Sequence, residues 1–474
     1  MRSDETSACL SGRSNQMSSQ SVQAEYGAAA LDLNITNDLA AFLASLSFED
    51  LPEAAIHTGR RGILDWIGCA LAGSRHPTIS KLLSVLEEVG GMPQATVLGR
   101  DMKLGLLEAP IANGQMGHVL DFDDTHMGGV VLHASSPILS ALLALAERSA
   151  FTGRDFLAAY AAGFEAGVRA GQGAPAHHAG GWHLTGTLGS IAAGAAAGKL
   201  LGLNSQQMVH ALGISATQAA GMQQNRGTMC KSFHAGKAAS SGVLAALLAQ
   251  KGFDSSDEIL EGKRGFCRIY SSVAKTDLVL DELGTRWEIT RNGHKPYACG
   301  VVLHPAIDAM IALARKVPAS DQVTAIELRV NPLAVSITGV ADPKTGLKSK
   351  FSLTHSVAVA FLDRAAGITQ YTDDRSRHPD VVALREIVSV QTDEGLGKDQ
   401  AWAAVVMRNG DRYEHQVAHA SGTVDNPMSD AAIEDKFLTN AAPVIGQERA
   451  SRILEMVRQL ERLGDVRNLL ALCA

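Results

Sequence analysis

Several features that would mark a secreted, membrane-bound or nucleic-acid-binding protein are scarce or missing. The 474 residues include only six cysteines, and no two of them form a CxxC pair. This argues against a disulfide framework or a zinc ribbon and is typical of reduced thiols in a cytoplasmic protein. No run of about 18 uncharged apolar residues occurs, so we expect no membrane span. There is no Lys/Arg tract and the formal net charge is −7, so we expect no nucleic-acid partner.

Common catalytic and cofactor motifs are also missing. The sequence has no GxxxxGK[ST] phosphate loop, no convincing strand–GxGxxG–helix unit, and no HExxH, GxSxG or EF-hand pattern. These absences argue against a nucleotide cofactor and against the metalloprotease, serine hydrolase and calcium-binding classes. Pyridoxal phosphate stays open at this point, because a single lysine is enough to hold it.

The composition is that of a large globular chain. Hydrophobic residues make up 46% and charged residues 19%, which supplies enough apolar surface for a sizeable core. The length predicts two or three domains. Residues 1–26 are polar, rich in serine and without an apolar signal segment, so we expect a disordered extension and no signal peptide there.

Between about residues 35 and 268 the apolar residues recur at helical spacing. Residues 51–73 begin with Pro52 near the start of a three–four pattern and close at Gly73, which predicts one long helix. Residues 186–203 are mostly Gly and Ala, and small side chains let helices approach closely, so we expect a helix buried on most sides. This part predicts a helical, bundle-like domain.

The pattern changes near residue 270. Residues 324–331 alternate apolar and polar side chains, residues 386–392 give a second strand, and Asn409-Gly410 lies between two strand-like runs, which predicts a hairpin. Helical patterns lie between these strands and return after residue 428. We therefore predict a mainly α fold. Its expected parts are a large all-helical domain (residues 27–268 and 419–474) and a smaller α+β domain (residues 269–418).

The most unusual stretch, "GHVLDFDDTHMGGVVLH" at residues 117–133, holds three aspartates and three histidines. If residues 113–125 are helical, His118, Asp121 and Thr125 share one face, with His133 following in a loop. A solvated acidic helix end, a metal site and the wall of a proton-transfer site are all compatible with this composition. The His–Asp spacings match no standard metal motif, so we predict no metal.

Three later segments carry further candidate groups. His183 sits at the expected start of the Gly/Ala-rich helix, where backbone N–H groups favour an anion. The segment "NRGTMCKSFHAGKAASSG" places Lys231 and His234 on one helix face. "GHKPYACGVVLHPA" offers Lys295 and neighbouring polar groups where the pattern changes, and clefts often form at domain junctions. Each segment is also compatible with a surface loop or turn.

Five blocks in this order resemble one family. They are "GHVLDFDDTH", "GWHLTGTLGS", "GTMCKSFHAGKAA", "KPYACGVVLHPAID" and "DPKTGLKSKFSLTHSVA", and together they resemble the MmgE/PrpD family over about residues 35–470. That family includes 2-methylcitrate dehydratase, cis-aconitate decarboxylase and iminodisuccinate epimerase. The resemblance implies a homodimer in which a helical domain, built from both ends of the chain, carries a smaller α+β lid. It places the active site in the cleft between the two domains.

The resemblance also implies a set of site residues and no metal or organic cofactor. By motif, the catalytic residues fall on Asp121, Thr125, His133, His183, Lys231 and Lys295. Substrate binding is expected at His234, Tyr297 and His304. The lysines would hold carboxylates and the histidines would move protons at neutral pH. Asp121 is expected to orient one imidazole.

The implied chemistry takes place at a carbon next to a carboxylate. We favour a cytoplasmic, cofactor-independent carbon–carbon or carbon–oxygen lyase. Its substrate would be a small anionic polycarboxylate like cis-aconitate, and the reaction a decarboxylation or dehydration. An isomerase that epimerises an iminodisuccinate-like dicarboxylate is one alternative. A non-catalytic binding protein of the same family is another. Both enzyme reactions build up negative charge beside a carboxylate.

Overall fold

The computed structural model describes residues 34–318 and 322–474, and residues Ile35–Ala474 form one compact unit. The extension expected at residues 1–26 lies outside the described residues. The fold is mainly α with a smaller α+β part, as predicted. Among the described residues, no helix combines the length and the apolar character that crossing a membrane requires.

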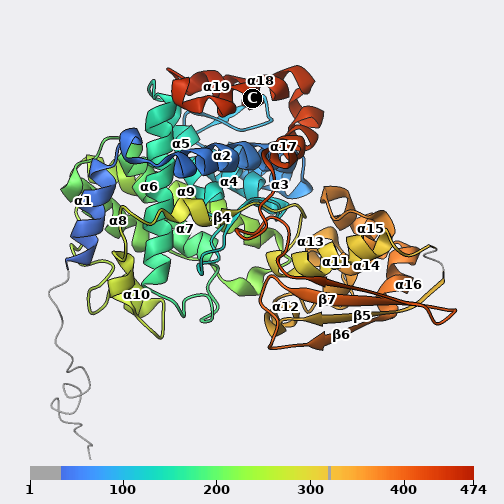
Figure 1. Cartoon of the computed structure of the whole chain (residues 1–474). Coiled ribbons are helices and arrows are strands. Elements are labelled where there is room, and N and C mark those ends of the chain that lie inside the picture. Colours follow the sequence, from blue (N-terminus) through green and yellow to red (C-terminus); the bar gives the residue numbers. More distant parts are fainter. Residues whose placement is uncertain (1–33, 319–321) are drawn as a thin grey trace, which may run out of the picture. The chain divides into compact units, whose positions relative to one another are not determined.

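Helices from both ends of the described chain build the larger part (Figure 1). They are α1 (Ile35–Ser45), α2 (Glu53–Gly73), α3 (Pro77–Val89), α4 (Glu108–Val119), α5 (Ser135–Ala146), α6 (Gly153–Gln172), α7 (Leu184–Leu200), α8 (Ser205–Ala216), α9 (Met229–Gln250), α10 (Phe266–Ile269), α17 (Asp430–Ile445), α18 (Gln447–Arg458) and α19 (Arg467–Cys473). Two short antiparallel pairs join them, β1 (Ala95–Thr96) with β2 (Lys103–Leu104) and β3 (Thr125–His126) with β4 (Asn292–Gly293).

Helix α7 lies at the centre of this part. It packs against α5, α6, α8 and α9, and every residue of α7 except Lys199 is buried. A Cβ added at Gly242 of α9 would lie 2.5 Å from the backbone of Ala193, so glycine is needed for this close approach. The predicted buried Gly/Ala helix is therefore confirmed. The predicted limits of α2 are confirmed as well, with Pro52 at its N-cap and Gly73 as its last residue.

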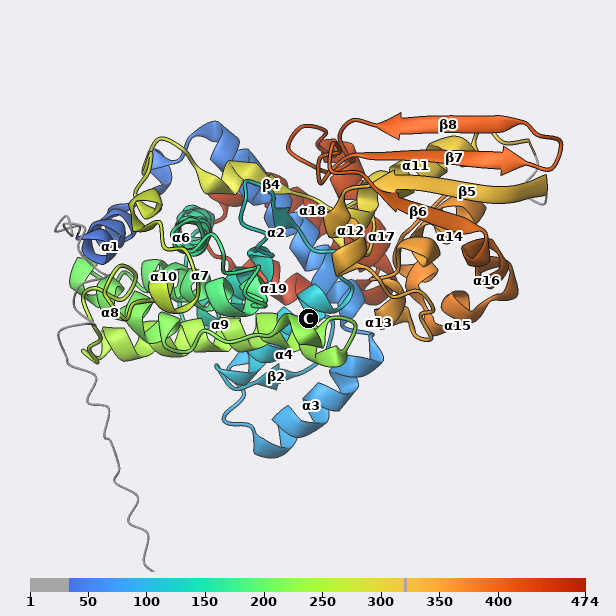
Figure 2. The ribbon, with the colours of Figure 1, turned by 90° about the horizontal axis from the view of Figure 1, so that it is seen from below.

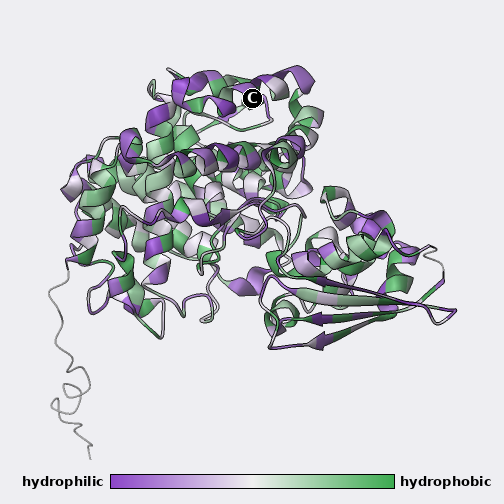
Figure 3. Cartoon of the chain, in the orientation of Figure 1, coloured by the Kyte–Doolittle hydropathy of each residue, from purple (hydrophilic) through white to green (hydrophobic). Residues whose placement is uncertain are grey.

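The smaller part is built on a four-stranded sheet in the order β6-β5-β7-β8. Strand β5 (Val323–Val330) pairs in parallel with β6 (Val388–Thr392) and antiparallel with β7 (Ala401–Met407), which forms a hairpin with β8 (Arg412–Val417). The predicted hairpin turn is confirmed, with Gly410 at φ +91°. Figure 3 shows hydrophobic and hydrophilic residues interleaved along these strands.

Helices cover one face of this sheet (Figures 1 and 2). They are α11 (His304–Ala314), α12 (Pro332–Ile337), α13 (Gly346–Ser349), α14 (Leu353–Asp363), α15 (Asp373–Arg377) and α16 (Pro379–Glu386), of which α11 lies directly against β7 and β8. Helix α16 runs to Glu386, so the second predicted strand begins two residues later than expected, at Val388.

Among the described residues, two hydrophobic clusters form the core, and the acid–histidine stretch at residues 117–133 contributes to both. Leu132 and Ala134 belong to the helical cluster. Leu120 and Phe122 instead pack in the cluster of the α+β part, with α11 and α14. Asp121 lies between these two apolar anchors, so its backbone is fixed at the junction of the two parts. The proposed domain boundaries at residues 269 and 419 stay a prediction.

Candidate active site

The stretch at residues 117–133 does not continue as a helix. Helix α4 ends at Val119, and Asp121 has φ +50°, a left-handed conformation that is uncommon for a residue with a side chain. The predicted helix to residue 125 is wrong, because Thr125 instead enters β3 and pairs with Gly293. A solvated acidic helix end is also wrong, since all three aspartates of the stretch are buried.

Two lysines from distant segments bind the Asp121 carboxylate. Lys231 Nζ, near the start of α9, donates to Oδ2 at 2.9 Å, and Lys295 Nζ, which follows β4, donates to Oδ1 at 2.5 Å. Burial alone would raise the pKa of Asp121, but the two ammonium groups outweigh it and hold the pKa well below its usual value. Burial lowers the pKa of Lys231, and Asp121 opposes this shift. Two cations therefore share one anion, leaving positive charge for a ligand.

Three lysines hold the backbone around Asp121, and we call them the lysine clasp. Lys350 Nζ donates to Leu120 O at 2.7 Å, Lys295 Nζ to Asp121 O at 3.0 Å, and Lys436 Nζ to Phe122 O at 2.7 Å. The same ammonium of Lys350 also binds Ala298 O at 2.7 Å, and that of Lys436 binds Lys295 O at 2.9 Å. Consecutive carbonyls are thus tied to residues 295–298, which stabilises the left-handed turn and keeps Lys295 beside Asp121.

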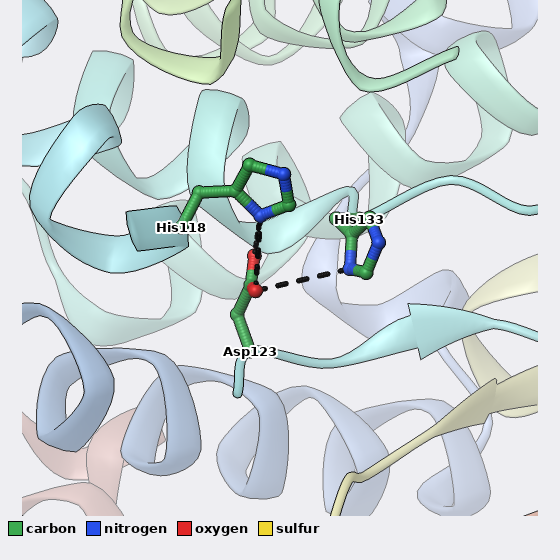
Figure 4. Close-up of side chains that lie close together, drawn as sticks. All are labelled: His118, Asp123 and His133. Carbon is green, nitrogen blue, oxygen red and sulfur yellow. Dashed lines mark hydrogen bonds and ion pairs between the residues drawn. The ribbon is translucent and has the colours of Figure 1, made fainter. Parts of the chain in front are cut away.

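Asp123, and not Asp121, orients an imidazole. Its carboxylate accepts from His118 Nδ1 at 2.9 Å and from Ser136 Oγ at 2.8 Å. Figure 4 shows His118 and His133 on either side of Asp123. Since His118 Nδ1 donates to the carboxylate, its Nε2 accepts from Lys231 Nζ at 3.3 Å. The expectation that Asp121 orients an imidazole is therefore wrong, because both its oxygens are held by lysines.

His133 is neutral and carries its proton on Nδ1. Its Nδ1 lies 2.8 Å from Asp124 O and 2.9 Å from Thr125 Oγ1. A carbonyl oxygen only accepts, so Nδ1 holds the proton and Nε2 carries the free electron pair. Burial, and then the charge of Lys295, lower the pKa of His133 well below 6.5. His133 is therefore a proton acceptor at neutral pH.

His183 and His234 form a second imidazole pair. His183 is the N-cap of α7, and its Nδ1 lies 2.9 Å from Nδ1 of His234 in α9. The ring of His183 stacks on that of His118 with centroids 5.5 Å apart. Burial, and then Lys231, lower the pKa of His183 well below its usual value. Among the described residues its Nε2 has no hydrogen-bond partner, so this nitrogen is available to a ligand.

The six catalytic candidates line one cavity of about 690 Å³. They come from the turn after α4, from β3, from the loop before α5, from the starts of α7 and α9, and from the segment after β4; they are Asp121, Thr125, His133, His183, Lys231 and Lys295. Phe351, Leu333 and Ile337 of the α+β part supply an apolar wall. The cavity thus lies where the two parts meet and combines cations, neutral imidazoles and apolar surface.

The three predicted substrate-binding residues lie outside the lining of this cavity. His234 is behind His183 and contacts it. Tyr297 lines a second cavity of about 570 Å³, where its hydroxyl donates to Asp308 Oδ1 at 2.5 Å. His304 is buried at the start of α11, with its ring against Tyr297. Substrate binding by these three stays a prediction.

Two groups of side chains could hold a metal ion in the described part of the chain. One is His118, Asp123 and His133 (Figure 4). In it, the His118–Asp123 hydrogen bond and the His133 contacts to backbone and Thr125 occupy the atoms that a metal would use. A metal here must break these bonds. The other, formed by residues 399, 419 and 425, is largely exposed.

Several site residues were missed from the sequence. His118, Asp123 and Arg226 stand inside conspicuous stretches, but spacing alone did not separate them from their neighbours. Lys436 carries a usable signal, because it lies between the buried Ile433 and Phe437 on the apolar face of α17. A lysine on such a face requires a buried partner, which here is Asp65 at 2.6 Å together with the backbone carbonyls.

Comparison with known proteins agrees with the architecture. The MmgE/PrpD N-terminal domain matches residues 37–278, and the MmgE/PrpD C-terminal domain matches residues 297–462. The chain is 28% identical to cis-aconitate decarboxylase of Aspergillus terreus, over 92% of this chain and 95% of that protein. It is 30% identical to the cis-aconitate decarboxylase-like protein oryM of Aspergillus oryzae (93% and 97%) and 25% identical to cis-aconitate decarboxylase of Mus musculus (91% and 92%). These relatives support a lyase-type enzyme.

Proposed function

We propose, from the premise that this chain belongs to the MmgE/PrpD family, that it is a cofactor-independent lyase acting on a cis-aconitate-like di- or tricarboxylate. The observation that carries the proposal is the shared cavity. Two lysines bound to one aspartate face two neutral imidazoles there, and all four groups come from segments far apart in the sequence. The names of the full-length relatives support decarboxylation as the reaction.

The positive groups account for binding and charge stabilisation. Lys231 and Lys295 together carry two positive charges against the single charge of Asp121, so a substrate carboxylate meets a net attraction. Negative charge that develops next to this carboxylate in the transition state is stabilised by the same ammonium groups. They are already positioned by Asp121 and need little reorganisation.

The protonation states assign the proton-transfer roles. Two of the three N–H bonds of Lys231 point to Asp121 and His118, which leaves one for the substrate. Its lowered pKa makes the ammonium a better acid than an exposed lysine. Neutral His133, with a free Nε2, is the matching base. We assign protonation of the product carbon to Lys231 and proton removal to His133.

For decarboxylation, the bond between the carboxylate and its carbon breaks and CO₂ leaves. The electron pair stays on the carbon framework, where the neighbouring carboxylate and the lysines stabilise it. A proton from Lys231 then forms the new C–H bond, and the amine regains a proton from solvent. Dehydration and epimerisation begin instead with proton removal by His133. Dehydration then expels hydroxide from the neighbouring carbon, whereas epimerisation returns the proton to the opposite face of the same carbon.

Proton NMR in D₂O separates these reactions. The pure protein is incubated separately with cis-aconitate, 2-methylcitrate and iminodisuccinate. Our proposal predicts loss of CO₂ from cis-aconitate, with itaconate signals that carry deuterium at the newly protonated carbon. Deuterium at an α-carbon of iminodisuccinate without loss of CO₂ would favour the epimerase. Silence with all three substrates would favour the binding-protein alternative.

Two controls address cofactor and assembly. Turnover that is unchanged after dialysis against EDTA supports the metal-free proposal, and loss that is restored by one divalent metal would contradict it. We also propose that the protein is a cytoplasmic homodimer, as the resemblance implies. Light scattering coupled to size-exclusion chromatography tests the dimer, and a single-chain mass would contradict it.

A further inference from the structure

A third cationic side chain, Arg226, lines the same cavity as Lys231 and Lys295. It lies between the short turn Gln223–Asn225 and α9, and it is half-buried. Within residues 34–318 and 322–474 it forms no ion pair with a carboxylate, whereas both lysines are bound to Asp121. A half-buried guanidinium without a counter-ion, in a protein of net charge −7, points to an anionic ligand.

The guanidinium is held in place by neutral groups. Its Nη2 donates to Gln223 Oε1 at 2.6 Å and lies 3.4 Å from His178 Nε2. Gln223 is itself anchored, since its amide donates to His178 O at 2.6 Å and to Trp182 O at 2.9 Å. These contacts use the two N–H groups of Nη2, so three of the five guanidinium N–H groups remain for a ligand.

A second cation lines the cavity from the α+β part. It is Lys398, in the loop between β6 and β7, and no ion pair of it occurs among the described residues. The nearby acids Asp399 and Asp425 bind His419, at 2.8 and 3.9 Å. Burial first, and then the charges of Arg226 and Lys398, lower the pKa of His178. Both cations therefore lie close enough to His178 to repel a proton on its ring.

We propose that Arg226, positioned by His178 and Gln223, and Lys398 bind a substrate carboxylate other than the one beside the reacting carbon. The inference rests on the proposed function and assigns residues to the second carboxylate of its di- or tricarboxylate substrate. One carboxylate binds at Lys231 and Lys295, and the other binds between the helical part and the α+β part. An acid with a single carboxylate would leave Arg226 desolvated and unpaired, which disfavours it.

Binding of a non-reacting acid tests this separately from turnover. Propane-1,2,3-tricarboxylate is titrated calorimetrically into the wild type and into Arg226→Gln, Arg226→Lys and Lys398→Gln. We expect Arg226→Gln to weaken binding about 10- to 100-fold, because it removes charge-assisted hydrogen bonds. Arg226→Lys should restore part of the loss, and Lys398→Gln should weaken binding less, since Lys398 is exposed.

Lys251→Gln is the matched control, because it removes one charge from an exposed lysine outside the cavity lining. It should bind the acid as the wild type does. Equal affinity of the wild type and Arg226→Gln, or a wild type that binds no acid at millimolar concentration, would overturn the subsite. If Arg226→Gln binds weakly but the wild type turns over none of the three substrates, the subsite stands and the proposed function fails. If the wild type turns over cis-aconitate but Arg226→Gln binds the tricarboxylate as tightly as the wild type does, the proposed function stands and the subsite fails.

Discussion

The two cavities have similar volumes, about 690 and 570 Å³, and both contain carboxylates and histidines, yet their charges are held differently. In the larger cavity Asp121 stays ionised between buried Lys295 and half-buried Lys231. In the smaller one, burial raises the pKa of Asp308, and the groups that bind it are the Tyr297 hydroxyl and the Ser421 N–H. Volume and residue type are therefore similar in the two cavities. The larger cavity differs because it holds the opposite charges of Asp121 and two lysines beside an imidazole nitrogen, His183 Nε2, that has no hydrogen-bond partner among the described residues.

Lys231→Met, in the larger cavity, is expected to reduce turnover more than any other variant proposed here. This change removes the proposed acid and one of the two ammonium groups on Asp121. We expect kcat/KM to fall by a factor of about 10²–10⁴. The measurement is steady-state turnover of cis-aconitate. Lys237→Met is the control on the same helix, because Lys237 is exposed, binds Ser241 and does not line the cavity. Equal losses in both variants would contradict the role of Lys231.

The second prediction compares the loss of an imidazole from the larger cavity, in His183→Ala, with the loss of one from the smaller cavity. We expect turnover to fall by about a hundredfold, because Nε2 of His183 is free to contact the substrate. The matched variant is His415→Ala in the smaller cavity, which should keep wild-type rates. Wild-type turnover by His183→Ala would remove it from the catalytic set.

A smaller effect concerns stability and distinguishes Asp124 from its neighbour Asp123. Burial raises the pKa of Asp124 to about 7, since its hydrogen bonds come from neutral Ser135 and Asn292. The folded state therefore keeps a proton that the unfolded chain loses above about pH 4, so stability falls as pH rises from about 4 to 7. Between pH 5 and 8 the wild type should lose about 1–3 kcal/mol more than Asp124→Asn.

Urea unfolding at both pH values measures this difference. The Asp123→Asn variant is a comparison, because burial would raise the pKa of Asp123 but His118 outweighs it and lowers the pKa. Asp123 is therefore ionised in both the folded and the unfolded state from pH 5 to 8, and its replacement should leave the pH dependence over this range unchanged. Parallel pH dependence of the wild type and Asp124→Asn would show that Asp124 is ionised in the folded protein.

The smallest effect is expected from Tyr297→Phe. The hydroxyl of Tyr297 is bound to Asp308 in the smaller cavity, so its loss should change KM for the substrate less than about twofold. Substrate binding by Tyr297, as the resemblance implies, predicts a larger increase in KM. Michaelis–Menten kinetics with cis-aconitate decide between the two.

The sequence predicted what depends on local periodicity. The limits of α2, the buried helix α7, strand β5 and the hairpin at Gly410 all follow from side-chain spacing within one element. The catalytic candidates were predicted only through the resemblance, since spacing alone left a surface loop, a metal site and a proton-transfer site open. Six of those candidates line one cavity.

What could not be predicted depends on contacts between distant segments. Helical spacing continued through Asp121, but carbonyl contacts from Lys350 and Lys436, 230 and 314 residues away from their acceptors, accompany a left-handed turn. Lys231 and Lys295, also distant in sequence, bind the Asp121 carboxylate, so the imidazole of His118 binds Asp123 instead. No property of residues 117–133 alone encodes these partners, so sequence spacing could not choose among the three aspartates.

The lysine clasp also has a consequence for the order of synthesis. Leu120, Asp121 and Phe122 leave the ribosome long before Lys295, Lys350 and Lys436, and each of these lysines must arrive before its carbonyl is bound. A nascent chain that lacks α17 therefore contains Asp121 but not the Lys436 contact to the neighbouring Phe122 carbonyl. The turn around Asp121 therefore gains its last backbone contact, from Lys436 to Phe122 O, only when α17 has been synthesised near the end of the chain.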